Sequence, residues 1–234
     1  MVNDLSLVIP NKDDSDVISK NFDNITKYLQ RVCNNFEILI ITNGSNKKTI
    51  NQIDDLINLN SDCRQIVVDK AGKGRAVKVG LENAKYNNVL ISDADFSVAI
   101  EEVEKFILSN KFLSPFIIGT RRDISSENVN SPLRRKFFGG IYIFFVQKLF
   151  RFQFTDTQCG FKYINLIEFS QSKNLTTYGF SFDLELILLA IQHNIEITEV
   201  PVKYIHNNDS SVNLFRDSVK MFVSALKLYY RFLN

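Results

Sequence analysis

The sequence predicts an α/β protein with a mostly parallel central sheet and helices on both faces. Strand-type apolar runs alternate with helix-type segments through the first half of the 234 residues, and repeated β-α units imply right-handed crossovers and a parallel sheet. One apolar run ends in Asp93-Ala94-Asp95. Alternate side chains of an extended backbone project to the same side, so Asp93 and Asp95 converge at the carboxyl end of a strand, where open α/β sheets bind their ligands.

The elements of the first half follow from the spacing of apolar residues. Short apolar runs predict five strands, at residues 5–9, 36–41, 66–68, 89–91 and 116–119. Apolar positions three and four residues apart predict three helices between the strands, at residues 17–32, 49–59 and 76–84. This half therefore consists of successive β-α units.

The second half follows a different pattern. A polar loop at 125–131 leads into a basic and aromatic helix at 132–152, followed by a helix at 180–192, a strand at 196–204 and a closing helix. In the closing helix, apolar residues recur in steps of three and four from Val212 to Leu233. This apolar seam is expected to pack on its own domain, with a homodimer contact or a membrane surface as alternatives. No internal repeat or linker divides the chain, so one domain spans 1–234.

Composition excludes several classes of protein. Apolar residues make up 45% of the chain and the formal net charge is +2, which is ordinary for a globular protein and provides no basic excess for nucleic acid. From the pattern of its first residues we expect no signal peptide, and no apolar run reaches the about 18–20 residues that span a bilayer. The widely spaced Cys33, Cys63 and Cys159 have no metal-ligand spacing and are expected to be reduced thiols. We therefore expect a cytoplasmic protein.

Two motifs in the first half indicate a phosphate and metal site. Carboxylate oxygens such as those of Asp93 and Asp95 suit Mg²⁺ or Mn²⁺ shared with substrate phosphates, although an isolated Asp-x-Asp is also typical of a polar turn. Lys73 and Gly74 lie in a Gly-rich loop before a helix, where the backbone can approach a ligand and free N–H groups bind anions. Alone, this loop is also compatible with a tight connection.

The order of the motifs is more specific than any one of them. Gly72-Lys73-Gly74 and Asp93-Ala94-Asp95 precede three further segments, which are Gly119-Thr120-Arg121-Arg122, Arg134-Arg135-Lys136 and Asp156-Thr157-Gln158-Cys159-Gly160-Phe161-Lys162. This order resembles the inverting family 2 glycosyltransferases with the GT-A fold, from about residue 5 to the end of the chain. The similarity is strongest to the polyprenyl-phosphate branch, which includes dolichyl-phosphate β-glucosyltransferases and dolichol-phosphate mannosyltransferases.

The resemblance implies a role for each matching residue. It implies a nucleotide-sugar-binding half at 1–120 and an acceptor-side half, with amphipathic helices, at 121–234. The residues expected to bind the nucleotide sugar are Pro10, Asn43, Lys73, Gly74, Asp93, Ala94 and Asp95, with Asp93 and Asp95 as metal ligands. The catalytic candidates are Asp156, Asp183, Arg121, Arg134 and Arg135. Gln158, Lys162, His206 and Ser210 are expected on the acceptor or phosphate side.

Two departures from the family pattern affect the expected ligands. The second strand of such enzymes normally ends in Asp-Asp-Gly-Ser, and Thr42-Asn43-Gly44-Ser45 stands here. Asn43 retains the ability to hydrogen-bond a base, but the identity of the base is left open. The second departure is Ser211, which replaces the lysine of the family's Ser-Lys-Val stretch.

The resemblance implies metal-dependent transfer of a hexose from a nucleotide sugar to a polyprenyl phosphate, with glucose from UDP-glucose as the best match. Alternatives are a GDP-mannose donor, a soluble or glycan hydroxyl acceptor, and a catalytically weak nucleotide-sugar-binding protein. A hydroxyl acceptor would need a general base, with Asp156 or Asp183 as candidates. A phosphate acceptor is already ionised near neutral pH. The basic and aromatic segment 134–151 predicts peripheral contact with the cytosolic membrane face, or else an ordinary buried helix.

Overall fold

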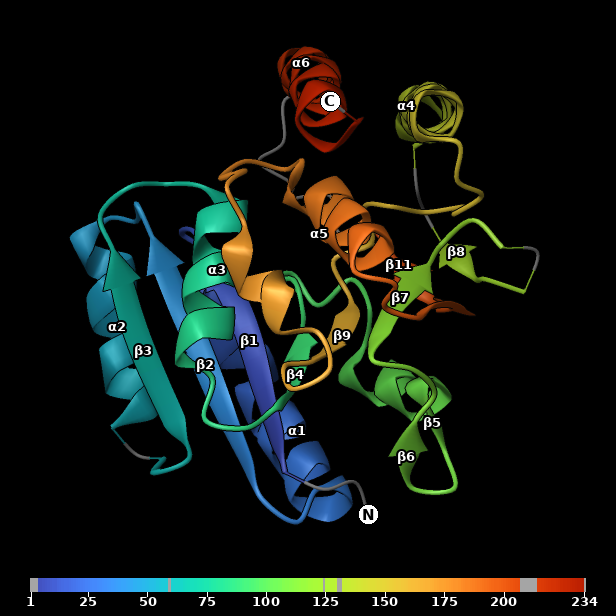
Figure 1. The fold of residues 1–234 in the computed structure, drawn as a ribbon. Helices are drawn as coiled ribbons and strands as arrows, with labels where there is room; N and C mark the ends of the chain where they lie inside the picture. Colours follow the sequence, from blue (N-terminus) through green and yellow to red (C-terminus); the bar gives the residue numbers. More distant parts are fainter. Residues whose placement is uncertain (1–3, 59, 124, 130–131, 207–213, 234) are drawn as a thin grey trace.

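A computed structural model describes residues 4–58, 60–123, 125–129, 132–206 and 214–233. Seven strands form one sheet in the order β10-β7-β9-β4-β1-β2-β3 (Figure 1). Their bounds are β1 Leu5–Asn11, β2 Phe36–Asn43, β3 Cys63–Val68, β4 Asn88–Ile91, β7 Phe116–Thr120, β9 Lys162–Asn165 and β10 Ile197–Pro201. The expected α/β fold with a mostly parallel sheet is confirmed.

Central strand β1 sets the register of the sheet. It pairs in parallel with β2 and β4, so that Leu7 lies opposite Ile38 on one side and Leu90 on the other. Strand β9 is antiparallel to both β4 and β7. The apolar pattern did not predict β9, because this strand is only four residues long and includes Lys162.

Helices cover both faces of the sheet, as expected. Leu7 and Ile9 of β1 face the core that is shared with α1 (Ser15–Val32), α2 (Lys47–Ile57) and the short 3-10 helix η1 (Ile100–Phe106). Val8 faces the opposite core, with α3 (Lys73–Asn83) and α5 (Phe182–Gln192). A β-carbon on Gly80 would lie 2.3 Å from Val8, so glycine allows α3 to pack closely on β1.

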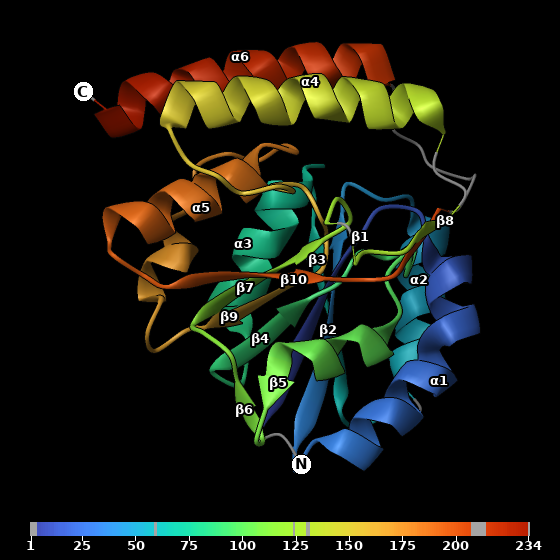
Figure 2. The same cartoon turned by 90° about the vertical axis from the view of Figure 1, so that its right-hand side faces the viewer.

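A third layer covers α5. Helices α4 (Leu133–Phe150) and α6 (Leu214–Leu233) lie side by side across it (Figure 2). Six buried side chains form this small core, namely Tyr142, Val146, Leu184, Leu188, Ala225 and Leu228. The expected seam of α6 is only partly correct, since Phe222 packs against this core whereas Val219 and Leu226 are exposed. Among the described residues, no helix is long and apolar enough to cross a membrane.

Short elements complete the fold and were not predicted as separate segments. The predicted strand at 196–204 is interrupted after Pro201, and Tyr204–Ile205 (β11) pairs instead with Asn128–Val129 (β8). A hairpin joins Ile107–Leu108 (β5) to Lys111–Phe112 (β6). A 3-10 helix, η2, spans Ser170–Asn174. The three cysteines are buried and form no disulfide.

Candidate active site

The parallel strands bring most of the expected site residues to one edge of the sheet. Asn43 ends β2, Asp93 and Asp95 follow β4, and Arg121 follows β7. Because β9 is antiparallel, its first residue, Lys162, lies at the same edge, opposite Ile91. We call this the carboxyl edge. Segments that are far apart in the sequence therefore share one site.

Asp93 lies between a cation and a glycine. Its Oδ1 is 2.6 Å from Nζ of Lys73, a contact of opposite charges in which Oδ1 is not aligned for a hydrogen bond. A β-carbon on Gly160 would lie 2.1 Å from Cγ of Asp93. Only a residue without a side chain can therefore occupy position 160 while Asp93 keeps this position. Burial raises the pKa of Asp93, but Lys73, Lys162 and Arg121 together outweigh burial and lower it.

Asp95 is held by the backbone that follows it. Its Oδ1 accepts a hydrogen bond from Ser97 N at 2.9 Å. The neighbouring Asp14 carboxyl has a raised pKa because it is partly buried and faces the charge of Asp95. The acidic loop after β1 therefore lies near Asp95.

The carboxylates of Asp93 and Asp95 are chemically suited to a divalent ion that is also bound by a phosphate. Among the residues that the structure describes, no three acidic, His or Cys side chains form a metal cluster. Asp93 and Asp95 each bring one carboxylate to this edge, and Mg²⁺ is usually bound by one or two carboxylates together with substrate phosphates. A cationic group already lies against Asp93, since Lys73 Nζ contacts its Oδ1. The position therefore suits positive charge.

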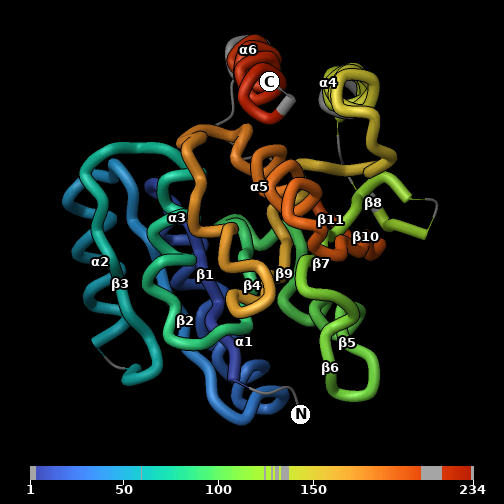
Figure 3. The backbone as a smooth tube through the Cα atoms, viewed as in Figure 1, coloured from blue at the N-terminus to red at the C-terminus, as the bar shows by residue number. Residues whose placement is uncertain are grey.

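The Gly-rich loop is fixed by the segment before α5. Gly72 has a φ of 152°, and a β-carbon there would lie 2.5 Å from the carbonyl oxygen of Tyr178. A β-carbon on Gly74 would lie 2.2 Å from the carbonyl oxygen of Thr177. The guanidinium of Arg75 lies over the Tyr178 ring, 4.0 Å from its centroid. The two segments run together in the backbone trace (Figure 3), so close packing within the chain already requires these glycines.

Asn43 joins β1 to the Gly-rich loop. Its Nδ2 donates to Asn11 O at 2.8 Å, and its Oδ1 accepts from Gly72 N at 2.9 Å. Contact with a base therefore stays a prediction for Asn43. The neighbouring Asn11 was not expected in the site, yet its side chain is buried and its Nδ2 has no hydrogen-bond partner among the described residues. Pro10 lies beside it in β1.

Arg121 and the buried Asp156 form a two-pronged ion pair. Nε and Nη2 of Arg121 donate to the two carboxylate oxygens at 2.7 and 2.9 Å. The Tyr204 ring covers the guanidinium at 5.2 Å, and the Tyr204 hydroxyl lies 3.3 Å from Nδ1 of His206. Glu199 accepts hydrogen bonds from the backbone N–H groups of Thr155 and Asp156. The expected basic position at Arg121 is thus rigidly held.

A second ion pair lies deeper. Nζ of Lys162 is 2.6 Å from Oδ1 of Asp183, and the two side chains are 1% and 4% exposed. The same ammonium donates to the carbonyl oxygen of Cys159. Burial raises the pKa of Asp183 more than Lys162 lowers it. The acceptor-side role of Lys162 stays a prediction, and its charge is balanced within the protein.

Of the remaining expected residues, Gln158 turns its side chain away from this cluster, and the others lie wholly or partly outside the described part. The side chain of Gln158 points to α6, where its Nε2 is 3.5 Å from the sulfur of Met221. Arg134 and Arg135 belong to α4 by their backbone, but their side chains are not among those described. Ser210 lies outside the described residues.

Sequence reasoning missed the contacts of Gly160, Tyr204 and Asn11. Gly160 stands inside the most specific motif, so its presence was visible while its contact with Asp93 was not. Nothing in the local pattern around Tyr204 or Asn11 distinguishes a site residue from a residue of an ordinary strand.

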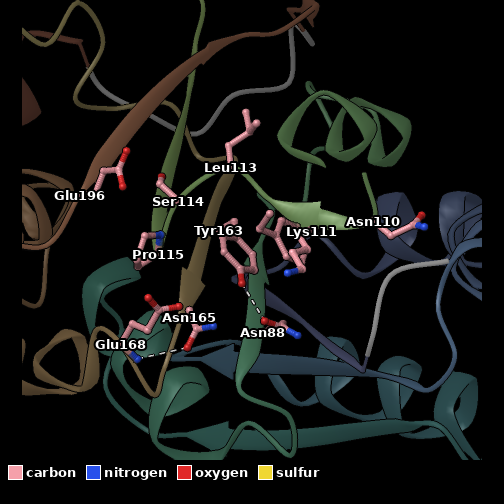
Figure 4. A pocket seen from close by; sticks show the side chains of 11 residues that line it. Asn88, Asn110, Lys111, Leu113, Ser114, Pro115, Tyr163, Asn165, Glu168 and Glu196 are labelled. Atoms are coloured by element: carbon pink, nitrogen blue, oxygen red, sulfur yellow. Dashed lines mark hydrogen bonds between the residues drawn. The ribbon is translucent and has the colours of Figure 1, made fainter. Parts of the chain in front are cut away.

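A separate pocket lies at the opposite edge of the sheet, beside Asn88 and Pro115 (Figure 4). The hydroxyl of Tyr163 donates to Oδ1 of Asn88 at 2.7 Å. Asn165 accepts hydrogen bonds from the backbone N–H groups of Ile167 and Glu168. These polar groups are satisfied within the protein, and none of the expected site residues lines this pocket.

Comparison with known sequences supports the resemblance that the motifs indicated. The family model for Glycosyl transferase family 2 matches residues 6–173. The dolichyl-phosphate beta-glucosyltransferase of Saccharomyces cerevisiae is 27% identical, over 93% of this chain and 71% of the relative. The human protein of the same description is 24% identical, over 98% of this chain and 76% of the relative.

Solved structures confirm the GT-A fold. Glucosyl-3-phosphoglycerate synthase from Mycobacterium tuberculosis, in complex with UDP, has a TM-score of 0.68 at 13% identity and covers 96% of this chain and 79% of its own. Mannosyl-3-phosphoglycerate synthase from Rubrobacter xylanophilus has a TM-score of 0.69 at 15% identity, covering 97% and 74%. The Mycobacterium tuberculosis enzyme is also known in complex with Mn²⁺, UDP-glucose and phosphoglyceric acid.

Proposed function

The chain belongs to glycosyl transferase family 2, and from that premise we propose that it transfers glucose from UDP-glucose to a polyprenyl phosphate such as dolichyl phosphate. The protein is a glycosyltransferase. Relatives described as dolichyl-phosphate beta-glucosyltransferases support glucose and the lipid phosphate. UDP is supported by the complexes of a protein with the same fold.

The carboxyl edge supplies the groups that such a donor needs. Asp93 and Asp95 would hold Mg²⁺ or Mn²⁺, which supplies positive charge to the diphosphate as it leaves. Arg121 adds a fixed cation at the same edge, because Asp156 and Tyr204 hold its guanidinium in place. Preorganised charge of this kind stabilises the developing negative charge without reorganisation.

The surroundings of Asp156 and Asp183, the two candidate general bases, are the observation that favours a phosphate acceptor over a hydroxyl acceptor. All described bonds to the Asp156 carboxylate come from Arg121 and Gln158. Despite burial, Arg121 lowers the pKa of Asp156 to about 2, so this carboxylate is a poor proton acceptor at neutral pH. Asp183 is 4% exposed and paired with Lys162. Neither group is placed to deprotonate a hydroxyl.

A lipid monophosphate does not need that base, since its second pKa is about 6 and its oxygens are largely ionised at neutral pH. One of these oxygens would attack the anomeric carbon from the face opposite the diphosphate. The new bond forms as the bond to the diphosphate breaks, and the configuration at that carbon is inverted. A polyprenyl phosphate therefore matches the chain better than a glycan hydroxyl.

The outer helices provide a surface that suits a lipid acceptor. Each packs some apolar side chains on α5 and leaves others exposed. The exposed ones recur at helical spacing, at Phe137, Ile141 and Phe144 of α4 and at Val219, Val223, Leu226 and Tyr230 of α6. The ammonium of Lys148 lies 5.7 Å from the Phe144 ring centroid. Basic and aromatic residues together are typical of helices that lie on anionic membranes, so we place the protein peripherally on the cytosolic face.

The activity is tested with UDP- and GDP-hexoses, Mn²⁺ and a short polyprenyl phosphate, and mass spectrometry detects the product. We expect glucosyl lipid from UDP-glucose, and loss of turnover in Asp95→Ala with an unchanged circular-dichroism spectrum. Asp16→Ala, an exposed acidic residue on α1, is the matched control. Transfer to a hydroxyl acceptor but not to the polyprenyl phosphate would refute the proposed acceptor.

Membrane contact is tested by co-sedimentation with vesicles that contain anionic lipid. Phe144→Ser should lower the bound fraction several-fold. Ile167→Ser is the control, because Ile167 is equally apolar and exposed but follows β9 at the opposite edge of the sheet. Equal losses in the two variants would contradict a specific role of α4.

A further inference from the structure

Two ion pairs at the carboxyl edge share the same chemistry but differ in exposure. Lys73 Nζ lies 2.6 Å from Asp93 Oδ1, and Lys162 Nζ lies 2.6 Å from Asp183 Oδ1. The inner pair is 1% and 4% exposed, whereas the side chains of Lys73 and Asp93 are 21% and 34% exposed. The outer pair is therefore partly exposed to solvent, although Oδ1 of Asp93 itself is buried, and the inner pair is part of the core.

Charge attraction, rather than directed hydrogen bonds, holds the outer pair. Oδ1 of Asp93 has no partner at hydrogen-bond angles, and the same is true of Oδ1 of Asp183 in the inner pair. Lys73 is the first residue of α3, and its flexible stem carries a compact charge that can be repositioned. The Arg121–Asp156 pair differs in this respect, because two directed hydrogen bonds lock its guanidinium.

These contacts create a conflict once a divalent ion binds. An ion on Asp93 would meet the ammonium that already lies against the same carboxylate, and two cations at that distance repel each other strongly. A diphosphate resolves the conflict, because it brings negative oxygens that can accept Lys73. The Gly-rich loop that carries Lys73 is where such an anion is expected to bind.

We propose that Lys73 is an exchangeable counter-ion, which neutralises Asp93 until a divalent cation binds and then moves to the nucleoside diphosphate. This inference rests on the proposed function, because it takes Asp93 as a metal ligand. Its consequence is cooperative binding. The metal alone must displace Lys73, whereas the metal with a diphosphate gives Lys73 a new partner, so each ligand favours the other.

The test measures Mn²⁺ binding by the full chain, from the electron paramagnetic resonance signal of free Mn²⁺, with and without UDP. Lys73→Met and Lys73→Gln should bind Mn²⁺ about tenfold more tightly than the wild type in the absence of UDP. The increase in affinity that UDP produces in the wild type should largely disappear. Lys70→Met is the matched control, since it removes the same charge from an exposed position in the same loop.

The outcomes separate the two proposals. If the wild type binds Mn²⁺ but neither Lys73 variant binds it more tightly without UDP, the counter-ion role is wrong and the metal site stands. Absence of Mn²⁺ binding by the wild type and both variants, even with UDP, overturns the metal site and this inference together. Circular dichroism of each variant establishes that the fold is retained, and two different neutral side chains guard against a defect particular to one.

Discussion

Replacing Asp156 by asparagine tests how the buried pair with Arg121 supports both the fold and the site. The Asp156 side chain is 2% exposed. Burial alone would raise its pKa, but the Arg121 guanidinium reverses the effect and lowers the pKa from 3.8 to about 2. A difference of that size corresponds to about 2.5 kcal/mol of stability at neutral pH. For a domain of this length we expect the melting temperature to fall by roughly 5–10 °C.

The pH dependence of the stability lost in Asp156→Asn identifies the cause of that loss. Because the folded-state pKa is depressed, the stabilisation is present above the unfolded value near 3.8 and disappears as the pH falls toward 2. Urea unfolding of wild type and Asp156→Asn should therefore show a constant gap above about pH 5 that narrows on acidification. Asp123→Asn, an exposed carboxylate in the loop after β7, serves as the control. A variant as stable as the wild type at pH 7 would refute the reasoning.

Two further substitutions examine the contacts around Asp93 and the inner ion pair. Gly160→Ala should cost about 1–3 kcal/mol and weaken Mn²⁺ binding, because the added methyl group overlaps the Asp93 carboxylate; Gly179→Ala, which has open space at its β-carbon, should change neither quantity. Lys162→Met should cost about 3–5 kcal/mol in urea unfolding by leaving Asp183 buried and unpaired, and adding Asp183→Leu should recover part of the loss. Additive losses in the double variant would contradict the pairing.

The strands that carry long apolar runs were predictable, because their signal is local. Strand β1 was expected at 5–9 and spans Leu5–Asn11. Strand β9 was not, since four residues that include a buried lysine carry no apolar signature. Its place between β4 and β7 depends on pairing with strands far away in the sequence, and Lys162 is tolerated there because Asp183 lies within reach.

In the candidate site, too, local sequence predicted some features, and others depend on tertiary contacts. The spacing of Asp93 and Asp95 after a strand predicted that both would lie at the carboxyl edge. It did not predict that Lys73 would contact Asp93, or that Gly160 would leave room for its carboxylate. The amide of Asn43 was expected to contact a base, and the structure shows it bridging β1 and the Gly-rich loop. Such contacts join residues from different elements, so no local spacing encodes them.

The sequence by itself determined the α/β class, the alternation of long strands and helices in the first half, the family and the chemical types of residue at the site. These depend on periodicity, on turn chemistry and on motifs that are read along one stretch of chain. Only the tertiary structure decided which charges face each other. It paired Arg121 with Asp156 and Lys162 with Asp183, and left Lys73 against Asp93 in partial contact with solvent. Ion pairs form between atoms that folding brings within about 4 Å, and that proximity arises from strand order and helix packing.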